Sequence, residues 1–146
     1  MNVKIITLLI SALSISTAMS ATVEDMDHRL DSLFGAHQPY HAFFDRLQTS
    51  VAHKDKDRLA LMVSYPITVS VKGKKTRIRT ASDFKKHYDV IFTPVYSRAI
   101  TRQKYEDLFA RDLGVMVGDG GQLWFSGVCP DSACKTTRVL ITGINN

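Results

Sequence analysis

Residues 114–126 read GVMVGDGGQLWFS, and this stretch decides the fold class of the chain. Its first part, 114–118, is a short apolar run of the kind that forms a buried strand. Asp119-Gly120 is a strong turn signal between two strands, and residues 122–126 supply the return strand. The stretch therefore predicts two antiparallel strands of a sheet.

Two further regions extend this sheet. Towards the C-terminus, residues 137–142 form a final strand. Towards the N-terminus, residues 67–71 alternate apolar and polar side chains, which is the period-2 pattern of a half-buried strand. Gly73 marks a turn, and residues 76–80 return as the partner strand, which predicts a hairpin.

Helical periodicity marks the other segments. A strong amphipathic pattern runs over residues 40–51, and a second helix begins at Asp55 or Asp57 and stops before Pro66. A third helix begins at the capping box of residues 80–83. The order of elements predicts an α+β domain, in which three main helices pack on an antiparallel sheet.

Two segments are harder to interpret. Residues 22–34 form a short amphipathic helix or an arm that docks on the body, so residues 22–37 are set apart from a main domain over 38–146. Residues 95–104 are ambiguous between helix and loop. If they are helical, the apolar residues Val95, Ala99 and Ile100 share one side.

The first 21 residues have the pattern of a secretory signal peptide. Lys4 gives a positive start, residues 5–15 are an apolar core, and residues 18–21 supply small side chains for cleavage. The core is too short to span a bilayer, which needs roughly 20 apolar residues. The sequence therefore predicts a periplasmic or secreted protein with no integral membrane segment in its mature form.

The mature chain has about 125 residues, which suits one domain with a real core. Without Lys4, 18 basic residues stand against 14 acidic ones, so the net charge is about +4. A hydrophobic fraction of 45% fits a compact globule and argues against disorder.

Only two cysteines occur, Cys129 and Cys134. A close, even pair in an exported chain is typical of a structural disulfide. The alternative is a redox-active pair, which needs an activating environment such as a helix N-terminus. The spacing is not Cys-x-x-Cys and Pro130 suggests a turn, so the structural disulfide is the prediction.

From about Tyr40 to Ile144, the chain resembles the nuclear transport factor 2-like superfamily, in particular small exported bacterial SnoaL-like proteins. The resemblance lies in the element order and in three groups of residues: Phe43-Phe44…Leu47; Asp57…Leu59-Ala60…Tyr65-Pro66; and Asp107-Leu108-Phe109…Gly114-Val115-Met116-Val117-Gly118-Asp119-Gly120…Trp124-Phe125. It implies a cone whose curved sheet forms a pocket on its concave face, closed by the helices.

Enzymes of this superfamily place an acid–base carboxylate and a hydrogen-bonding Tyr in that pocket. Tyr40 lies on the helix where ketosteroid isomerases keep a Tyr. No Asp lies in the interior of a predicted strand, however, because Asp119 belongs to a turn and Asp107 and Asp112 lie outside the apolar strand. This departure disfavours an enzyme. Because many domains of the superfamily pair through the outer face of the sheet, the resemblance also implies a homodimer as one arrangement.

Five residues are candidates for a pocket lining, because aromatic rings with polar tips and an imidazole suit a small-molecule site: Tyr65, His87, Tyr88, Met116 and Trp124. The competing interpretation is that the larger of these side chains are simply core. His87 with Asp89 or Asp45 is a candidate acid–base pair, although a single His on a helix face is more often structural.

Two histidines four residues apart, His37 and His41, have a spacing that can bind a metal on a helix. Pro39 lies between them, and no Glu follows His37 as in the zinc-protease motif. The sequence therefore predicts no metal site, and no cofactor.

The densest run of positive charge gives the candidates for a basic rim, joined by Lys85 and Lys86: Lys72, Lys74, Lys75, Arg77 and Arg79. On a hairpin, this run suits an anionic partner such as an acidic protein, a lipopolysaccharide phosphate or a nucleic acid. The competing interpretation is a solvated edge whose lysines discourage strand pairing. Export and the lack of interleaved aromatic residues disfavour nucleic acid.

The favoured function is an exported, soluble binding protein that holds a small ligand or a protein partner through the pocket or the basic rim. An inhibitor or immunity role against an exported toxin is one version of it. The alternative is a small cofactor-free enzyme of isomerase, cyclase or hydratase type, which would use acid–base residues in the pocket. No catalytic residue is assigned.

Overall fold

A computed structural model describes residues 20–71 and 73–146 of the chain. Most of the predicted signal peptide, and Lys72 of the basic run, lie outside these residues. The elements in chain order are α1 (Val23–Phe34), α2 (Gln38–Ala52), α3 (Lys56–Leu61), β1 (Ile67–Val71), β2 (Lys74–Ile78), α4 (Ala81–Ile91), α5 (Pro94–Thr101), β3 (Phe109–Arg111), β4 (Gly114–Val117), β5 (Leu123–Val128) and β6 (Arg138–Ile144).

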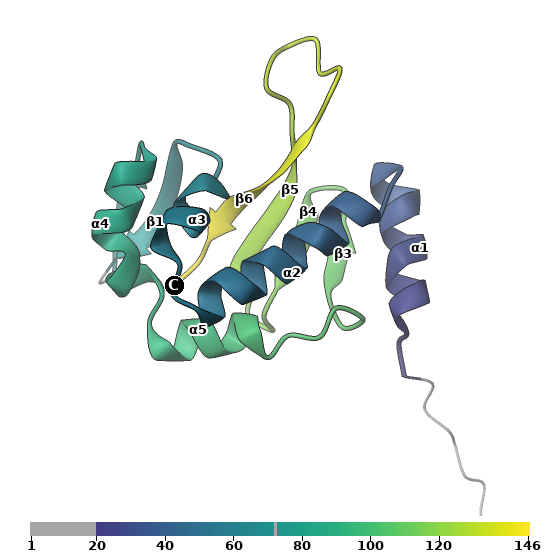
Figure 1. Cartoon of the computed structure of the whole chain (residues 1–146), viewed down its shortest axis with the longest axis horizontal. Helices are drawn as coiled ribbons and strands as arrows, with labels where there is room; N and C mark the ends of the chain where they lie inside the picture. The colour runs from purple at the N-terminus through teal and green to yellow at the C-terminus, as the bar shows by residue number, and fades with distance from the viewer. Residues whose placement is uncertain (1–19, 72) are drawn as a thin grey trace, which may run out of the picture.

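The strands form one curved sheet in the order β2-β1-β6-β5-β4-β3 (Figure 1). The predicted α+β class is confirmed, but the prediction of a purely antiparallel sheet is wrong, because β1 pairs in parallel with β6 at Val69 and Ile144. The chain enters β1 already paired with β6. The Ser64 N–H donates to the Ile141 carbonyl, and the Ile141 N–H donates to the Met62 carbonyl.

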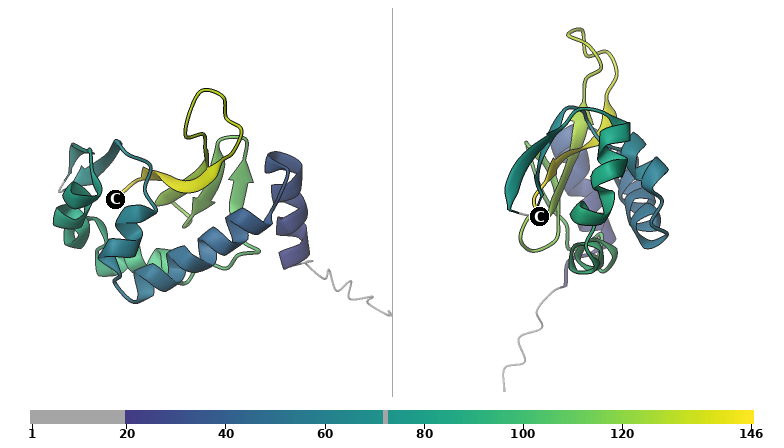
Figure 2. Two further views of the ribbon diagram at one scale, coloured as in Figure 1. Left: turned by 45° about the horizontal axis from the view of Figure 1, so that its top comes forward. Right: turned by 90° about the vertical axis from the view of Figure 1, so that its left-hand side faces the viewer.

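Helices α2, α3 and α4 lie on one side of the sheet (Figure 2). The apolar side of α2 buries Phe43, Phe44 and Leu47 against the inner face of the sheet. From the sheet, the strand residues Val115, Val117, Leu123, Phe125, Ile141 and Ile144 complete this core. The rings of Phe43 and Phe125 lie 4.9 Å apart, so helix and sheet meet through aromatic contacts.

The helix caps form at residues whose side chains suit them. The Thr80 hydroxyl accepts a hydrogen bond from the Asp83 N–H, which confirms the predicted start of α4. The reciprocal capping box occurs at α1, where Thr22 and Asp25 bond each other's backbone N–H groups. The Thr22 contacts also hold the pKa of Asp25 below its usual value.

Several sequence predictions need correction. The ambiguous segment contains helix α5, but its buried side holds Tyr96 and Ile100, while Val95 is 70% exposed. Strand β2 begins at Lys74 rather than at residue 76. Strand β3 was not expected, because its three residues are too few to show a period-2 pattern in the sequence.

The link between β5 and β6 projects beyond the body (Figure 1). Cys129 and Cys134 are joined there by a disulfide, with Cα atoms 4.9 Å apart, which confirms the predicted pairing. Residues 129–138 are exposed along this loop. Over the described residues, the helices are all too short or too polar to cross a membrane.

Gly114 fixes the approach of β4 to β5. Its φ is +134°, and a Cβ there would lie 2.6 Å from the Phe125 carbonyl oxygen. Gly35 has a φ of +82°, but a Cβ there meets open space. We expect Gly35→Ala to cost about 1 kcal/mol of unfolding free energy, and Gly114→Ala at least about 3 kcal/mol because backbone strain adds to a backbone clash. Urea unfolding measures both, and equal losses would contradict this role of Gly114.

Candidate functional site

The space where a pocket is expected, between α2 and the sheet, is filled. Phe43, Phe44 and Phe125 are almost fully buried there. The Tyr40 hydroxyl, which the resemblance places in a pocket, accepts a hydrogen bond from the Gly127 N–H at 3.2 Å. Burial raises the pKa of Tyr40, so this hydroxyl stays neutral and acts as a structural contact.

The five predicted pocket residues are not brought together. The Tyr65 hydroxyl donates to the Ala60 carbonyl at 2.8 Å, and the Tyr88 ring stacks on Phe92. Met116 and Trp124 face each other on β4 and β5. Their sequence neighbours are buried against the helices, so both side chains point to the opposite face of the sheet.

The predicted acid–base pair is not formed either. His87 Nδ1 lies 2.8 Å from the carbonyl oxygen of Asp83, one turn earlier in α4. Asp89 accepts from Lys56 Nζ at 2.8 Å, and Asp45 is an exposed residue of α2. His87 therefore makes a structural contact within its own helix.

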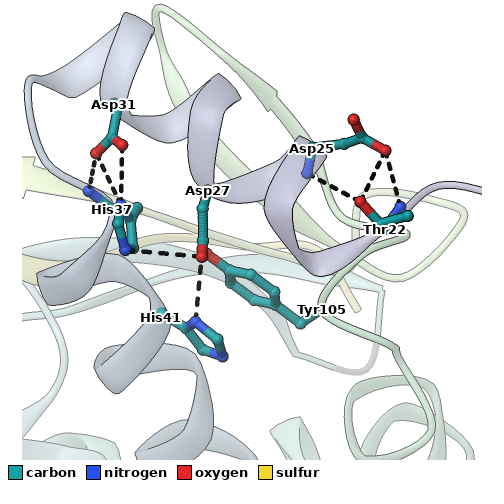
Figure 3. A network of polar contacts seen from close by, with 7 residues as sticks. All are labelled: Thr22, Asp25, Asp27, Asp31, His37, His41 and Tyr105. Carbon is teal, nitrogen blue, oxygen red and sulfur yellow. Dashed lines mark hydrogen bonds and ion pairs between the residues drawn. The ribbon is translucent and has the colours of Figure 1, made fainter.

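A cluster of acids and histidines joins α1 to the body (Figure 3). We call Asp27, Asp31, His37, His41 and Tyr105 the α1 clasp. His37 Nδ1 lies 2.9 Å from Asp31 Oδ1, and its Nε2 faces Asp27 Oδ2 at 3.6 Å. His41 Nδ1 faces the other oxygen of Asp27, also at 3.6 Å.

Asp27 is the hub of the clasp. The Tyr105 hydroxyl donates to its Oδ1 at 2.6 Å, and the Tyr105 ring stacks on His41 with centroids 3.6 Å apart. Burial and then this hydrogen bond raise the pKa of Tyr105. The hydrogen bond from His37 holds the pKa of Asp31 below its usual value.

The clasp holds α1 in place together with apolar contacts. Met26 and Leu30 of α1 are buried, and Phe34 stacks on Tyr40 with centroids 4.4 Å apart. This shows that residues 22–34 are a docked helix. Within the described part of the chain, acidic, histidine and cysteine side chains form no group that could hold a metal ion.

The basic run lies at an open edge of the sheet. Lys74, Lys75 and Arg77 belong to β2, the outermost strand, and Arg79 follows it; all four are exposed. We call the face of the sheet that points away from α2, α3 and α4 the helix-free face. Lys75 is opposite Ser70 and Arg77 is opposite Thr68, which places both on this face. Among the described residues, these four cations form no ion pair.

A second feature of the helix-free face was only partly predictable from the sequence. Phe109 of β3 is opposite Met116, which is opposite Trp124. We call these three residues the apolar row. Strand alternation in β4 and β5 already separates Met116 and Trp124 from the core, so that signal was present. The position of Phe109 needed strand β3, which has no sequence pattern of its own.

No protein-family model, no curated protein and no solved structure matches the chain. Interpretation of the site therefore depends on its own geometry.

The Tyr105 bond to a carboxylate predicts a graded effect of two Tyr→Phe changes. We expect Tyr105→Phe to lower the unfolding free energy by about 2 kcal/mol, because a hydrogen bond to a charged group is lost. Tyr65→Phe is the matched control, since its hydroxyl donates to a neutral carbonyl, and should cost about 1 kcal/mol. Urea denaturation followed by circular dichroism tests this, and a loss at Tyr105 no larger than at Tyr65 would contradict it.

Asp31 makes the stability that the α1 clasp provides depend on pH. Its pKa is lower in the folded chain than its usual 3.8. Ionised Asp31 therefore stabilises the fold above that usual value, and its contribution disappears as the pH falls through the folded-state pKa. We expect the fall in unfolding free energy from about pH 5 to about pH 2 to be shallower in Asp31→Asn than in the wild type. Parallel curves for the two proteins would refute this.

Proposed function

We propose that this chain is an exported binding protein that holds an acidic protein partner on the basic edge of its sheet. The observation that supports this proposal most is that basic residues lie on the sheet while the acidic residues lie elsewhere. The six described strands contain five Lys and Arg residues and no Asp or Glu, whereas the chain has 14 acidic residues in all. Of these five cations, Arg111 pairs with Asp112 at 2.9 Å, whereas Lys74, Lys75 and Arg77 of β2 form no ion pair within the described part of the chain. The β2 end of the sheet therefore presents positive charge that helices and loops do not neutralise.

The positively charged residues of β2 lie where a partner can reach them. Helices α2, α3 and α4 leave the other face of the sheet uncovered (Figure 2). The strand register places Lys75 and Arg77 on that uncovered face. A run of lysines on an edge strand also discourages unwanted pairing. Because Lys75 and Arg77 share one face of β2, beside Ser70 and Thr68 of β1, their charge lies on the face of the sheet as well as at its edge, and this favours a role in recognition.

Other functions have less support. The aromatic core fills the concave pocket that the resemblance implies for a small ligand. A cofactor-free isomerase, cyclase or hydratase would need an acid–base pair in that pocket, whereas the His–Asp contacts of the α1 clasp join α1 to the body. Two surface hollows lie beside α5: one of about 500 Å³ is lined by Arg98, Arg102 and Asp107 among others, and one of about 460 Å³ is lined by Tyr88, Asp89 and Arg98 among others. Both are open and carry both signs of charge, so neither gives a preference for one ligand.

We further propose that the fold is the cone of the nuclear transport factor 2-like superfamily. The support is the order of elements and the curved sheet with helices on one side. In this chain the cone would lack the usual pocket, since Phe43, Phe44 and Phe125 occupy it. Recognition would then have moved to the outside of the sheet.

Charge reversal tests the proposed function. Tagged wild-type protein and Lys75→Glu/Arg77→Glu are purified gently from the exported fraction of the native host and measured by native mass spectrometry. Arg29→Glu/Lys135→Glu is the control, with the same change in net charge at exposed sites outside β2. We expect an acidic partner on the wild type and the control, and about tenfold less on the β2 variant. Raising the salt concentration to about 0.5 M should release it.

Two results would contradict the proposal. One is the bare mass of the wild-type protein, and the other is a partner that the β2 variant retains. An added mass of a few hundred daltons would instead indicate a small ligand.

A further inference from the structure

One line of residues crosses the whole helix-free face. In order across the sheet, it runs through Arg77, Thr68, Gly143, Trp124, Met116 and Phe109. The parallel pair of Val69 with Ile144 makes the preceding residues, Thr68 and Gly143, neighbours. Residues in register on adjacent strands share a face, so a guanidinium and the apolar row lie at two ends of one surface.

The apolar end is open to a partner. Phe109 is 46% exposed, and its ring meets Trp124 edge-on at 6.5 Å and 82°. Gly143 and Gly121 lie beside Trp124. An added Cβ would come within 3.3 Å of the Trp124 Cβ at Gly143 and of the indole Nε1 at Gly121. Glycine at these positions therefore leaves room for the half-buried Trp124 side chain to lie against the sheet.

The two ends differ in chemistry, and this difference defines the partner. We infer that the acidic partner binds through one segment that lays an apolar side chain on Phe109, Met116 and Trp124 and carboxylates on Lys75 and Arg77. This inference rests on the proposed function. Three strand spacings separate β2 from β5, which is about 14 Å, or four to five residues of an extended chain.

Two other occupants fit the face less well. A second copy of this chain that pairs through the same face would bring the same strands, which carry no carboxylate to meet Lys75 and Arg77. A nucleic acid needs ring faces on which bases can stack. Phe109 and Trp124 meet edge-on, and so do not form parallel platforms.

The chain contains its own reporter, because Trp124 is the only tryptophan. The probe is a capped synthetic peptide with two glutamates, a four-residue Gly-Ser spacer and a Leu-Phe pair. The matched peptide has Ser-Ser in place of Leu-Phe. Indole emission of the full mature protein is recorded while each peptide is added up to about 1 mM, a range that detects weak binding.

We expect the Leu-Phe peptide to shift the Trp124 emission to shorter wavelength and to bind about tenfold more tightly than the Ser-Ser peptide. Phe109→Ala should remove that preference. Leu61→Ala is the control, because Leu61 is 72% exposed on α3 and lies away from this face. Lys75→Glu/Arg77→Glu should weaken both peptides, and circular dichroism checks that every variant is folded.

The outcomes separate the inference from the proposed function. If both peptides bind equally and the β2 variant binds neither, the proposed binding at the basic edge stands and the inferred contact with the apolar row is overturned. If neither peptide binds the wild-type protein, both are overturned. Tighter binding of an oligothymidine, or a dimer in sedimentation that already shields Trp124 from acrylamide, would also overturn the inference.

Discussion

The packing of α2 on the inner face of the sheet is the constraint on which the other features depend. Phe43 and Phe44 of the helix are buried on the concave side, where Phe43 meets Phe125. Strand alternation then determines the direction of every other side chain of β4 and β5. With the inner positions apolar and buried, Met116 and Trp124 must lie on the outer face. The same contact that stabilises the core therefore creates the apolar row.

The N-terminal helix extends this body by different means. Met26 and Leu30 contribute apolar burial, while the α1 clasp fixes the helix through hydrogen bonds and ion pairs centred on Asp27. Because α1 contacts α2 and β3, it lies at the β3 end of the sheet (Figure 1). The β2 end remains open, and positive charge gathers there.

Local patterns predicted most of the elements. The 3.6-residue period of α2, the alternation of β1 and the Asp119-Gly120 turn each depend on near neighbours, and each element is present. The parallel β1–β6 pair depends on residues about 75 positions apart, such as Val69 and Ile144, and no local pattern contains it. Contacts between distant residues were likewise not predictable from local patterns. The five pocket candidates could be grouped only by their chemistry, and the contacts among His37, Asp27 and Tyr105 were not expected.

Hydroxyl-radical footprinting of the wild-type protein, alone and in the complex purified from its host, tests most directly that recognition uses the helix-free face. We expect Trp124 and Met116 to be oxidised less in the complex, while Leu61 and Val95, exposed on the helices, react as in the free protein. Protection of Leu61 or Val95 with unchanged oxidation of Trp124 and Met116 would show that the partner binds elsewhere.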